Sequence, residues 1–214
     1  MTKLKFSRQV LVDHALDIAK EEGFDAISVR RVAAQAGCST GPIYTAFANV
    51  EDLIQETKNR VLDLLLEHVE EEYTPDSFLN VGVGTLVFTH KHPRLYKELY
   101  IDSFDAVHER RIRQRTVDRM KEAGLTNYLS EENIDILMSK MWLFTHGIAS
   151  KICSGAVTVE GTADFIEMLR ETGGEIITAM VVKSGRYTGT LEELIEGGEE
   201  NESRHFRWNI WNNR

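Results

Sequence analysis

The sequence predicts an all-α fold, on three observations. Prolines occur only at positions 42, 75 and 93 of the 214 residues, which leaves long stretches that helices can occupy without interruption. Apolar residues recur every three or four positions along these stretches, the spacing that gives a helix one apolar face. The nearest candidate for a strand, "ICSGAVTVEG" at 152–161, is short.

Two helices with matching end signals are expected near the N-terminus. The segment "SRQVLVDHALDIAKEEG" (7–23) begins with Ser7 as a plausible N-cap and stops at a glycine. The segment "SVRRVAAQAG" (28–37) begins with Ser28 and also stops at a glycine. Their inward faces are expected to hold Val10, Leu11, Ala15, Leu16, Ile18 and Ala19, then Val29, Val32, Ala33 and Ala36.

The next stretch, "AGCSTGPIYTAF" (36–47), admits two interpretations. Its G-x-S-x-G pattern at 37–41 matches a hydrolase nucleophile elbow, but an elbow needs a strand before its serine, and helical spacing precedes Ser39. A helix-turn-helix explains more: Ser39 caps a short helix, and Pro42 falls in its first turn, where a missing N–H costs little.

In this second interpretation Ile43 and Phe47, four residues apart, point into the core. The residues left facing outward are small or carry hydroxyls, which suits close approach to a DNA major groove. These outward residues are Thr40, Gly41, Tyr44 and Thr45.

A long amphipathic helix, "NVEDLIQETKNRVLDLLLEHVEEEY" (49–73), is expected to follow, with Asn49 as its cap and Pro75 as its stop. Its apolar residues from Val61 to Val69 are expected to pack into a larger domain. Further helices are expected at 76–91, 94–101, 103–122, 131–154 and 161–184, with a short one at about 190–196. The predicted domains are a helix-turn-helix domain (1–53), a helical ligand-binding and dimerisation domain (54–198) and a tail (199–214).

Charge and composition exclude several classes. The net charge is −9, yet residues 1–60 carry as many basic as acidic side chains, so that part is the one an anion could approach. With cysteines only at 38 and 153, neither a disulfide scaffold nor a Cys/His zinc site is expected, and no cofactor is predicted. There is no signal peptide or membrane-spanning run, so a cytoplasmic protein is the expectation. The basic segment 108–121 is expected to be a solvated helix face.

The order "ALDIAKEEGFDAISVRRVAAQAGCSTGPIYTAFANVEDLI" (15–54) closely resembles the N-terminal module of the TetR (tetracycline-repressor) family. The resemblance implies a three-helix DNA-binding domain whose third helix enters the major groove, and a homodimer on a two-fold operator. Two positions depart from the family's pattern: Val50 replaces a frequent lysine, and Ala46 replaces a frequent aromatic residue or histidine. The DNA-binding candidates are Ser28, Arg30, Arg31, Ser39, Thr40, Gly41, Tyr44, Thr45 and Asn49, supported by the N-terminal Lys3, Lys5 and Arg8.

The C-terminal domain resembles the family in two stretches, "HKHPRLYKELYID" (90–102) and "MWLFTHGIASKICSG" (141–155). The long helices at 131–154 and 161–184 have apolar faces that could pair with their copies in a homodimer. Polar-tipped aromatics and histidines suggest a ligand pocket. The ligand-binding candidates are His92, Tyr96, Tyr100, Met138, Trp142, Thr145 and His146.

These features predict a ligand-responsive DNA-binding transcriptional regulator that is not an enzyme. It would be a repressor that binds operator DNA, and a small-molecule effector would release it from that DNA. The helix at 49–73 would link the two sites. The alternatives are a hydrolase that uses the pattern at 37–41 and a helical adaptor that does not bind DNA. A thiol sensor built on Cys38 or Cys153 is a further one.

Overall fold

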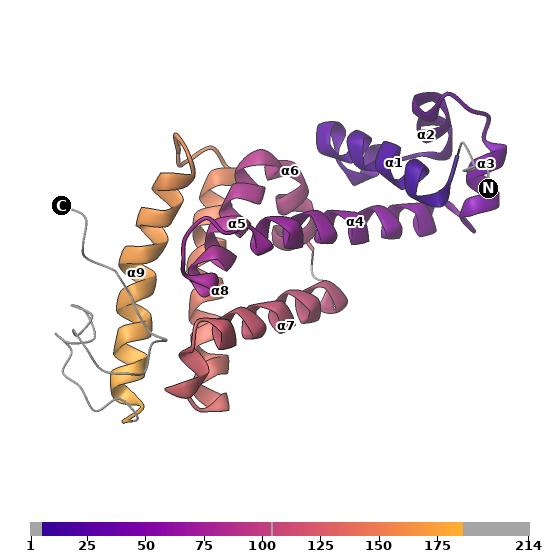
Figure 1. Ribbon diagram of the computed structural model, residues 1–214. Helices are drawn as coiled ribbons and strands as arrows, with labels where there is room; N and C mark the ends of the chain where they lie inside the picture. Colours follow the sequence, from indigo (N-terminus) through magenta and orange to yellow (C-terminus); the bar gives the residue numbers. More distant parts are fainter. Residues whose placement is uncertain (1–5, 104, 186–214) are drawn as a thin grey trace.

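The computed structural model describes residues 6–103 and 105–185, and within them the chain forms helices and turns, as the all-α prediction expected (Figure 1). The predicted helix at 190–196, the tail at 199–214, Lys3 and Lys5 lie outside the described residues. The α-helices are α1 (Arg8–Glu22), α2 (Val29–Ala36), α3 (Gly41–Ala46), α4 (Val50–Glu70), α5 (Ser77–Lys91), α6 (Pro93–Tyr96), α7 (Ala106–Glu122), α8 (Glu131–Cys153) and α9 (Thr162–Lys183). Three short turns join them: η1 (Phe24–Ala26), the π-helical η2 (Lys97–Ile101) and η3 (Leu125–Asn127).

Most of the predicted helix ends are confirmed. The side chains of Ser7, Ser28 and Asn49 each accept a hydrogen bond from a backbone N–H in the first turn of the helix that they precede. Gly37 ends α2 in the left-handed conformation, with φ of 66°, which a residue without a Cβ adopts at little cost. Local hydrogen bonding therefore sets the limits of the first helices.

Three expectations were wrong in detail. Ser39 does not cap α3; Thr40 occupies the N-cap position without a side-chain bond, and Pro42 lies in the first turn. The long helix ends at Glu70, well before Pro75, because the chain turns towards α5 there. Val10 is 36% exposed, since the buried face of α1 is centred on Leu11, Ala15 and their neighbours.

Helix α4 connects two parts of the molecule. Figure 1 shows α1–α3 gathered at one end of α4, and α5–α9 gathered around its other end. Leu53 of α4 is buried with the first group, whereas Val61, Leu62 and Leu65 are buried with the second; Leu66, expected there too, is only half-buried. At the second end α5 packs so close that a Cβ on Gly84 would lie 2.3 Å from the carbonyl oxygen of His68, so this crossing requires glycine.

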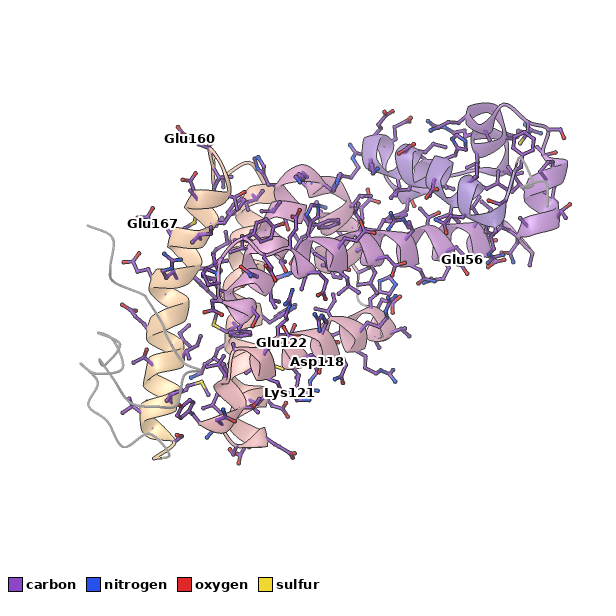
Figure 2. The ribbon with its side chains drawn as sticks, in the orientation of Figure 1. Glu56, Asp118, Lys121, Glu122, Glu160 and Glu167 are labelled. Carbon is purple, nitrogen blue, oxygen red and sulfur yellow. The ribbon has the colours of Figure 1, made fainter. Side chains whose placement is uncertain are left out.

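The basic helix α7 is more than the solvated face expected for 108–121. Three of its arginines bind α4: Arg111 pairs with Asp63 at 2.8 Å, Arg115 pairs with Glu70, and Arg119 donates to the Glu70 carbonyl. Helix α8 and helix α9 lie side by side at the far edge, where Glu160 and Glu167 project outward beside α9 (Figures 1 and 2). These contacts of α7 help to attach the bundle α5–α9 to α4.

Candidate functional site

The short helix α3 offers an exposed surface at the end of the molecule. Ile43 is 1% exposed and Phe47 3%, so both anchor the helix in the core. Tyr44 between them is 64% exposed, and Thr45, also exposed, donates its hydroxyl hydrogen to the Gly41 carbonyl at 3.0 Å. A fully anchored helix thus presents a tyrosine to the outside.

Arg8 fixes the placement of α3. Its guanidinium lies 4.4 Å from the centroid of the Phe47 ring and donates to the carbonyl of Ala46 at the end of α3. The same group pairs with Asp52 at 3.1 Å and Glu56 at 2.9 Å, both on α4. The pairs are partly exposed and contribute modestly one by one, but together they join three helices. Arg8, named from the sequence as a support for DNA binding, therefore uses its donors inside this domain.

The other DNA-binding candidates divide into two groups. Ser28 and Asn49 use their side-chain oxygens as helix caps, and Arg31 pairs with Glu22 of α1. The side chains of the second group make neither a cap hydrogen bond nor the Glu22 ion pair. This group lies in the turn and along α2 and α3, and consists of Arg30, Ser39, Thr40, Gly41, Tyr44 and Thr45. Thr40 is half-buried and the rest of this group is exposed.

A cavity of about 670 Å³ lies within the helical bundle, between α5, α7, α8, α9 and the π-helical turn η2. Six of the seven ligand-binding candidates line it: Tyr96, Tyr100, Met138, Trp142, Thr145 and His146. His92 does not; it lies at the junction of α5 and α6, with its ring 5.4 Å from that of Phe88. The volume is in the range of sites for small molecules.

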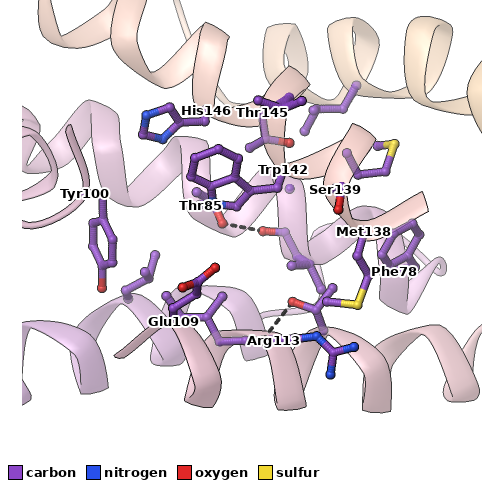
Figure 3. A pocket seen from close by; sticks show the side chains of 18 of the residues that line it. Phe78, Thr85, Tyr100, Glu109, Arg113, Met138, Ser139, Trp142, Thr145 and His146 are labelled. Carbon is purple, nitrogen blue, oxygen red and sulfur yellow. Dashed lines mark hydrogen bonds between the residues drawn. The ribbon is translucent and has the colours of Figure 1, made fainter. Parts of the chain in front are cut away.

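Polar side chains interrupt the apolar walls of this cavity. The Tyr96 hydroxyl and Nδ1 of His146 share a hydrogen bond of 3.1 Å, and the Trp142 ring stacks on His146 with centroids 4.6 Å apart. Burial lowers the pKa of His146, so that the imidazole is neutral at neutral pH. Figure 3 shows Trp142, Thr145 and His146 on one side of the cavity and Glu109 and Arg113 of α7 on the other.

The charged side of the cavity was not foreseen from the sequence. Glu109, Arg113 and Thr116 line it from α7, within the segment expected to face solvent. The signal that could have indicated it is Ile112, which falls between them at helical spacing and also lines the cavity.

A second unforeseen feature joins the cavity wall to α1, and we call it the α1 clamp. Arg94 donates to the carbonyl oxygen of Glu22 at 2.8 Å, and a carboxylate oxygen of Glu98 accepts the backbone N–H of Phe24 at 2.8 Å. Glu98 belongs to η2, the same turn that places Leu99 and Tyr100 in the cavity wall. Gly23 lies between Glu22 and Phe24, the two residues bonded by the α1 clamp, and has φ of 94°. A Cβ at this position would lie 2.3 Å from the Glu98 carboxylate.

The features of a hydrolase do not gather around Ser39. A helix, not a strand, precedes it, and Ser39 is exposed in the turn between α2 and α3. In the part of the chain that the structure describes, no group of three His, Cys, Asp or Glu residues could hold a metal ion, and no helix is long and apolar enough to cross a membrane.

Comparison with known proteins places these observations in a family context. Residues 11–57 match the model of "Bacterial regulatory proteins, tetR family". An uncharacterized HTH-type transcriptional regulator of Mycobacterium tuberculosis is 29% identical over 96 residues, which is 43% of this chain and 44% of that protein. The fatty acid metabolism regulator protein of Bacillus subtilis is 31% identical over 80 residues, or 37% of this chain and 41% of the other. The matches span less than half the length of these two curated relatives.

Solved structures extend the similarity in fold to the larger domain. A tetR-family transcriptional regulator from Streptomyces coelicolor matches with a TM-score of 0.64 at 16% identity, covering 89% of this chain and 94% of that one. A putative TetR-family regulator from Vibrio parahaemolyticus matches with a TM-score of 0.57 at 16% identity, covering 79% and 97%. At this identity the likeness concerns the fold.

Proposed function

We propose that the chain is a member of the tetR family of bacterial regulatory proteins, whose model matches residues 11–57, and that it is a homodimeric repressor that binds operator DNA and is released by a small molecule in its cavity. The observation that carries the DNA half is α3, on which Tyr44 is 64% exposed between two buried anchors. Tyr44 supports this half by its position on a short helix that its neighbours anchor in the core, with exposed Gly41 and Thr45 beside it. The proposal includes no catalytic step.

The DNA-contacting residues proposed are those of the exposed group, with Tyr44 and Thr45 at its centre. Small residues at the start of α3 allow its backbone to approach base edges or phosphates closely. Arg30 supplies positive charge beside them, from the exposed side of α2. Ser28, Arg31 and Asn49 act chiefly by holding the helices in place, through the caps and the Glu22 pair already described.

The partner proposed for α8 and α9 is a second copy of the chain. On α8 the side chains of Ile136 and Leu143, seven residues apart, are 41% and 64% exposed. Gly147, four residues further on the same face, has open space where a Cβ would lie. Val182 of α9 is 41% exposed. Two copies of such a face can pack as a four-helix interface, with the glycine allowing close approach.

The proposed release operates through two connections between cavity and DNA domain. One is α4, whose Leu65 lines the cavity and whose first turn follows α3. The other is the α1 clamp, because a ligand that displaces Tyr100 also moves Glu98 in the same turn. A π-helical turn is a common place for such functional movement. Coupling of this kind is worth about 1–3 kcal/mol and is reciprocal between the two ligands.

The α1 clamp gives a specific prediction. Glu98→Ala removes the carboxylate that accepts the Phe24 N–H, so amide hydrogen exchange at residues 24–27 should accelerate and operator affinity should fall by about 1 kcal/mol, the scale of one lost hydrogen bond. Lys97→Ala is the matched control, since Lys97 is exposed on the same turn and pairs only with Asp102 among the described residues. Equal exchange in the two variants would remove the clamp from the mechanism.

Selection from a random duplex library tests the proposed function. Protein-bound duplexes are recovered over several rounds and sequenced. A two-fold repeat should emerge, with half-sites separated by one helical turn or a multiple of it, about 10–10.5 base pairs centre to centre. Recovery without sequence enrichment would contradict the proposal and favour an adaptor that does not read DNA.

A further inference from the structure

Tyr100 carries an unsatisfied polar group inside the cavity. Its hydroxyl oxygen is buried and has no hydrogen-bond partner among the described residues. The neighbouring Tyr96 differs, because its hydroxyl pairs with His146. A buried hydroxyl without a partner destabilises a fold, and such groups in folded proteins call for an explanation. Because the Tyr100 side chain lines the cavity, a ligand atom can become the partner after a small shift of this side chain.

The missing partner is an acceptor. Burial raises the pKa of Tyr100, so the phenol keeps its proton and has it to donate. Several other hydroxyls on the wall donate elsewhere, among them Thr85 to the Val81 carbonyl at 2.8 Å and Thr116 to the Ile112 carbonyl at 2.9 Å. Tyr100 is the tyrosine of the wall whose buried hydroxyl has no partner among the described residues.

The charges around Tyr100 disfavour an anion. Burial by itself raises the pKa of Asp105, but hydrogen bonds from the backbone N–H groups of His108 and Val107 outweigh it. The net effect is a lowered pKa, so this carboxylate stays ionised. Glu109 adds a second acid to the lining. The only lysine or arginine among the described lining residues is Arg113, and it is paired with Asp135. Arg111, whose charge also acts on Tyr100, is paired with Asp63, so an incoming carboxylate would meet two acids and no unpaired cation among these residues.

A cationic head is also a poor match for the hydroxyl. An ammonium group could pair with Asp105 or Glu109, but it has no acceptor for the Tyr100 proton and leaves this hydroxyl unsatisfied. The walls beyond Tyr100 are mainly apolar, with Leu65, Phe78, Met138 and Leu169 among them. Figure 3 shows Tyr100 and Phe78 on opposite sides of the view, so a ligand that contacts both would be elongated.

Resting on the proposed ligand-binding function, we propose that the cavity takes an uncharged, elongated apolar molecule whose carbonyl or hydroxyl oxygen accepts a hydrogen bond from Tyr100. The corresponding carboxylate is rejected by Asp105 and Glu109. The apolar length supplies affinity, and the single donor at one end sets the orientation. A site built to pair with a polar atom discriminates strongly against ligands that cannot pair.

Three probes of equal chain length test this inference by calorimetry: methyl decanoate, decanoate and decylamine. The affinity for the ester should exceed the affinity for either charged probe by about 10-fold or more. Tyr100→Phe should weaken ester binding about 5–10-fold, the effect of one net hydrogen bond, while the melting temperature stays equal or rises because no protein partner is lost. Tyr44→Phe, which alters an exposed tyrosine far from the cavity, should leave ester binding unchanged.

Asp105→Asn tests the rejection of anions. Asparagine retains the capping oxygen that accepts from Val107 and His108, so α7 should remain intact while decanoate affinity rises. The inference is overturned if the ester does not bind, if a charged probe binds as tightly as the ester, or if Tyr100→Phe leaves ester binding unchanged. Duplex binding by the same preparations is measured separately, so failure here is distinguishable from failure of the DNA-binding proposal.

Discussion

Replacing Leu143 with glutamate is expected to convert the protein to a monomer and to weaken operator binding by about 10²–10⁴-fold. Leu143 is 64% exposed on α8, between Ile136 and Gly147 on the face proposed to meet the second copy, and it also lies at the edge of the cavity. A charge there would be buried unpaired between two copies, which is strongly unfavourable. A monomer engages one half-site alone and loses the gain from a second, tethered contact.

Val107→Glu is the matched control for this change. Val107 is 60% exposed but lies on α7, outside the proposed interface. Light scattering gives the oligomeric state, and fluorescence anisotropy gives the affinity for the selected duplex. If Leu143→Glu stays dimeric, or if Val107→Glu dissociates equally, then α8 does not form the interface.

Ile43→Ala and Tyr44→Ala should have opposite signatures although the residues are adjacent. Ile43 is 1% exposed, so its truncation leaves a cavity and should lower the free energy of unfolding by about 2–5 kcal/mol. Tyr44→Ala removes a side chain that the fold does not use, so stability should change little. Its operator affinity should fall by about 1–3 kcal/mol, the scale of one good contact.

Thermal unfolding and duplex binding of the two variants decide between the roles. The affinity of Ile43→Ala is measured at a temperature where the variant remains folded, and should then approach that of the unaltered protein. The proposed orientation of α3 would be wrong if Tyr44→Ala unfolded the domain while its folded fraction bound DNA normally.

The parts of this fold that sequence predicts well are governed by neighbours along the chain. Ser7, Ser28 and Asn49 each accept the backbone N–H three residues further along the chain, and the alternation of Ile43, Tyr44 and Phe47 follows from helical period alone. The predicted cap at Ser39 is the exception. Its neighbour Thr40 takes the N-cap position of α3, a difference of one residue that the local sequence pattern does not resolve.

The α1 clamp and the cavity depend on residues far apart in sequence. Glu98 and Phe24 are 74 positions apart, and nothing in either segment specifies the other. Tyr96, Tyr100 and Trp142 were identified by their chemistry as polar-tipped aromatics, but the unsatisfied hydroxyl of Tyr100 emerges only when packing shows what surrounds it. His92 has the same chemistry and lies outside the cavity, because α5 and α6 turn it towards Phe88.

The most direct measurement of the central claim, that the protein reads a DNA sequence, is its affinity for the selected duplex and for a scrambled duplex of equal composition, across a range of salt concentrations. We expect a preference for the selected duplex of about 10³-fold or more. Both affinities should fall as salt rises, by about 0.9 log units per log unit of salt for each phosphate contacted, despite the net charge of −9, because the local surface sets this slope. Equal affinities for the two duplexes would contradict sequence reading, and affinity insensitive to salt would contradict DNA as the partner.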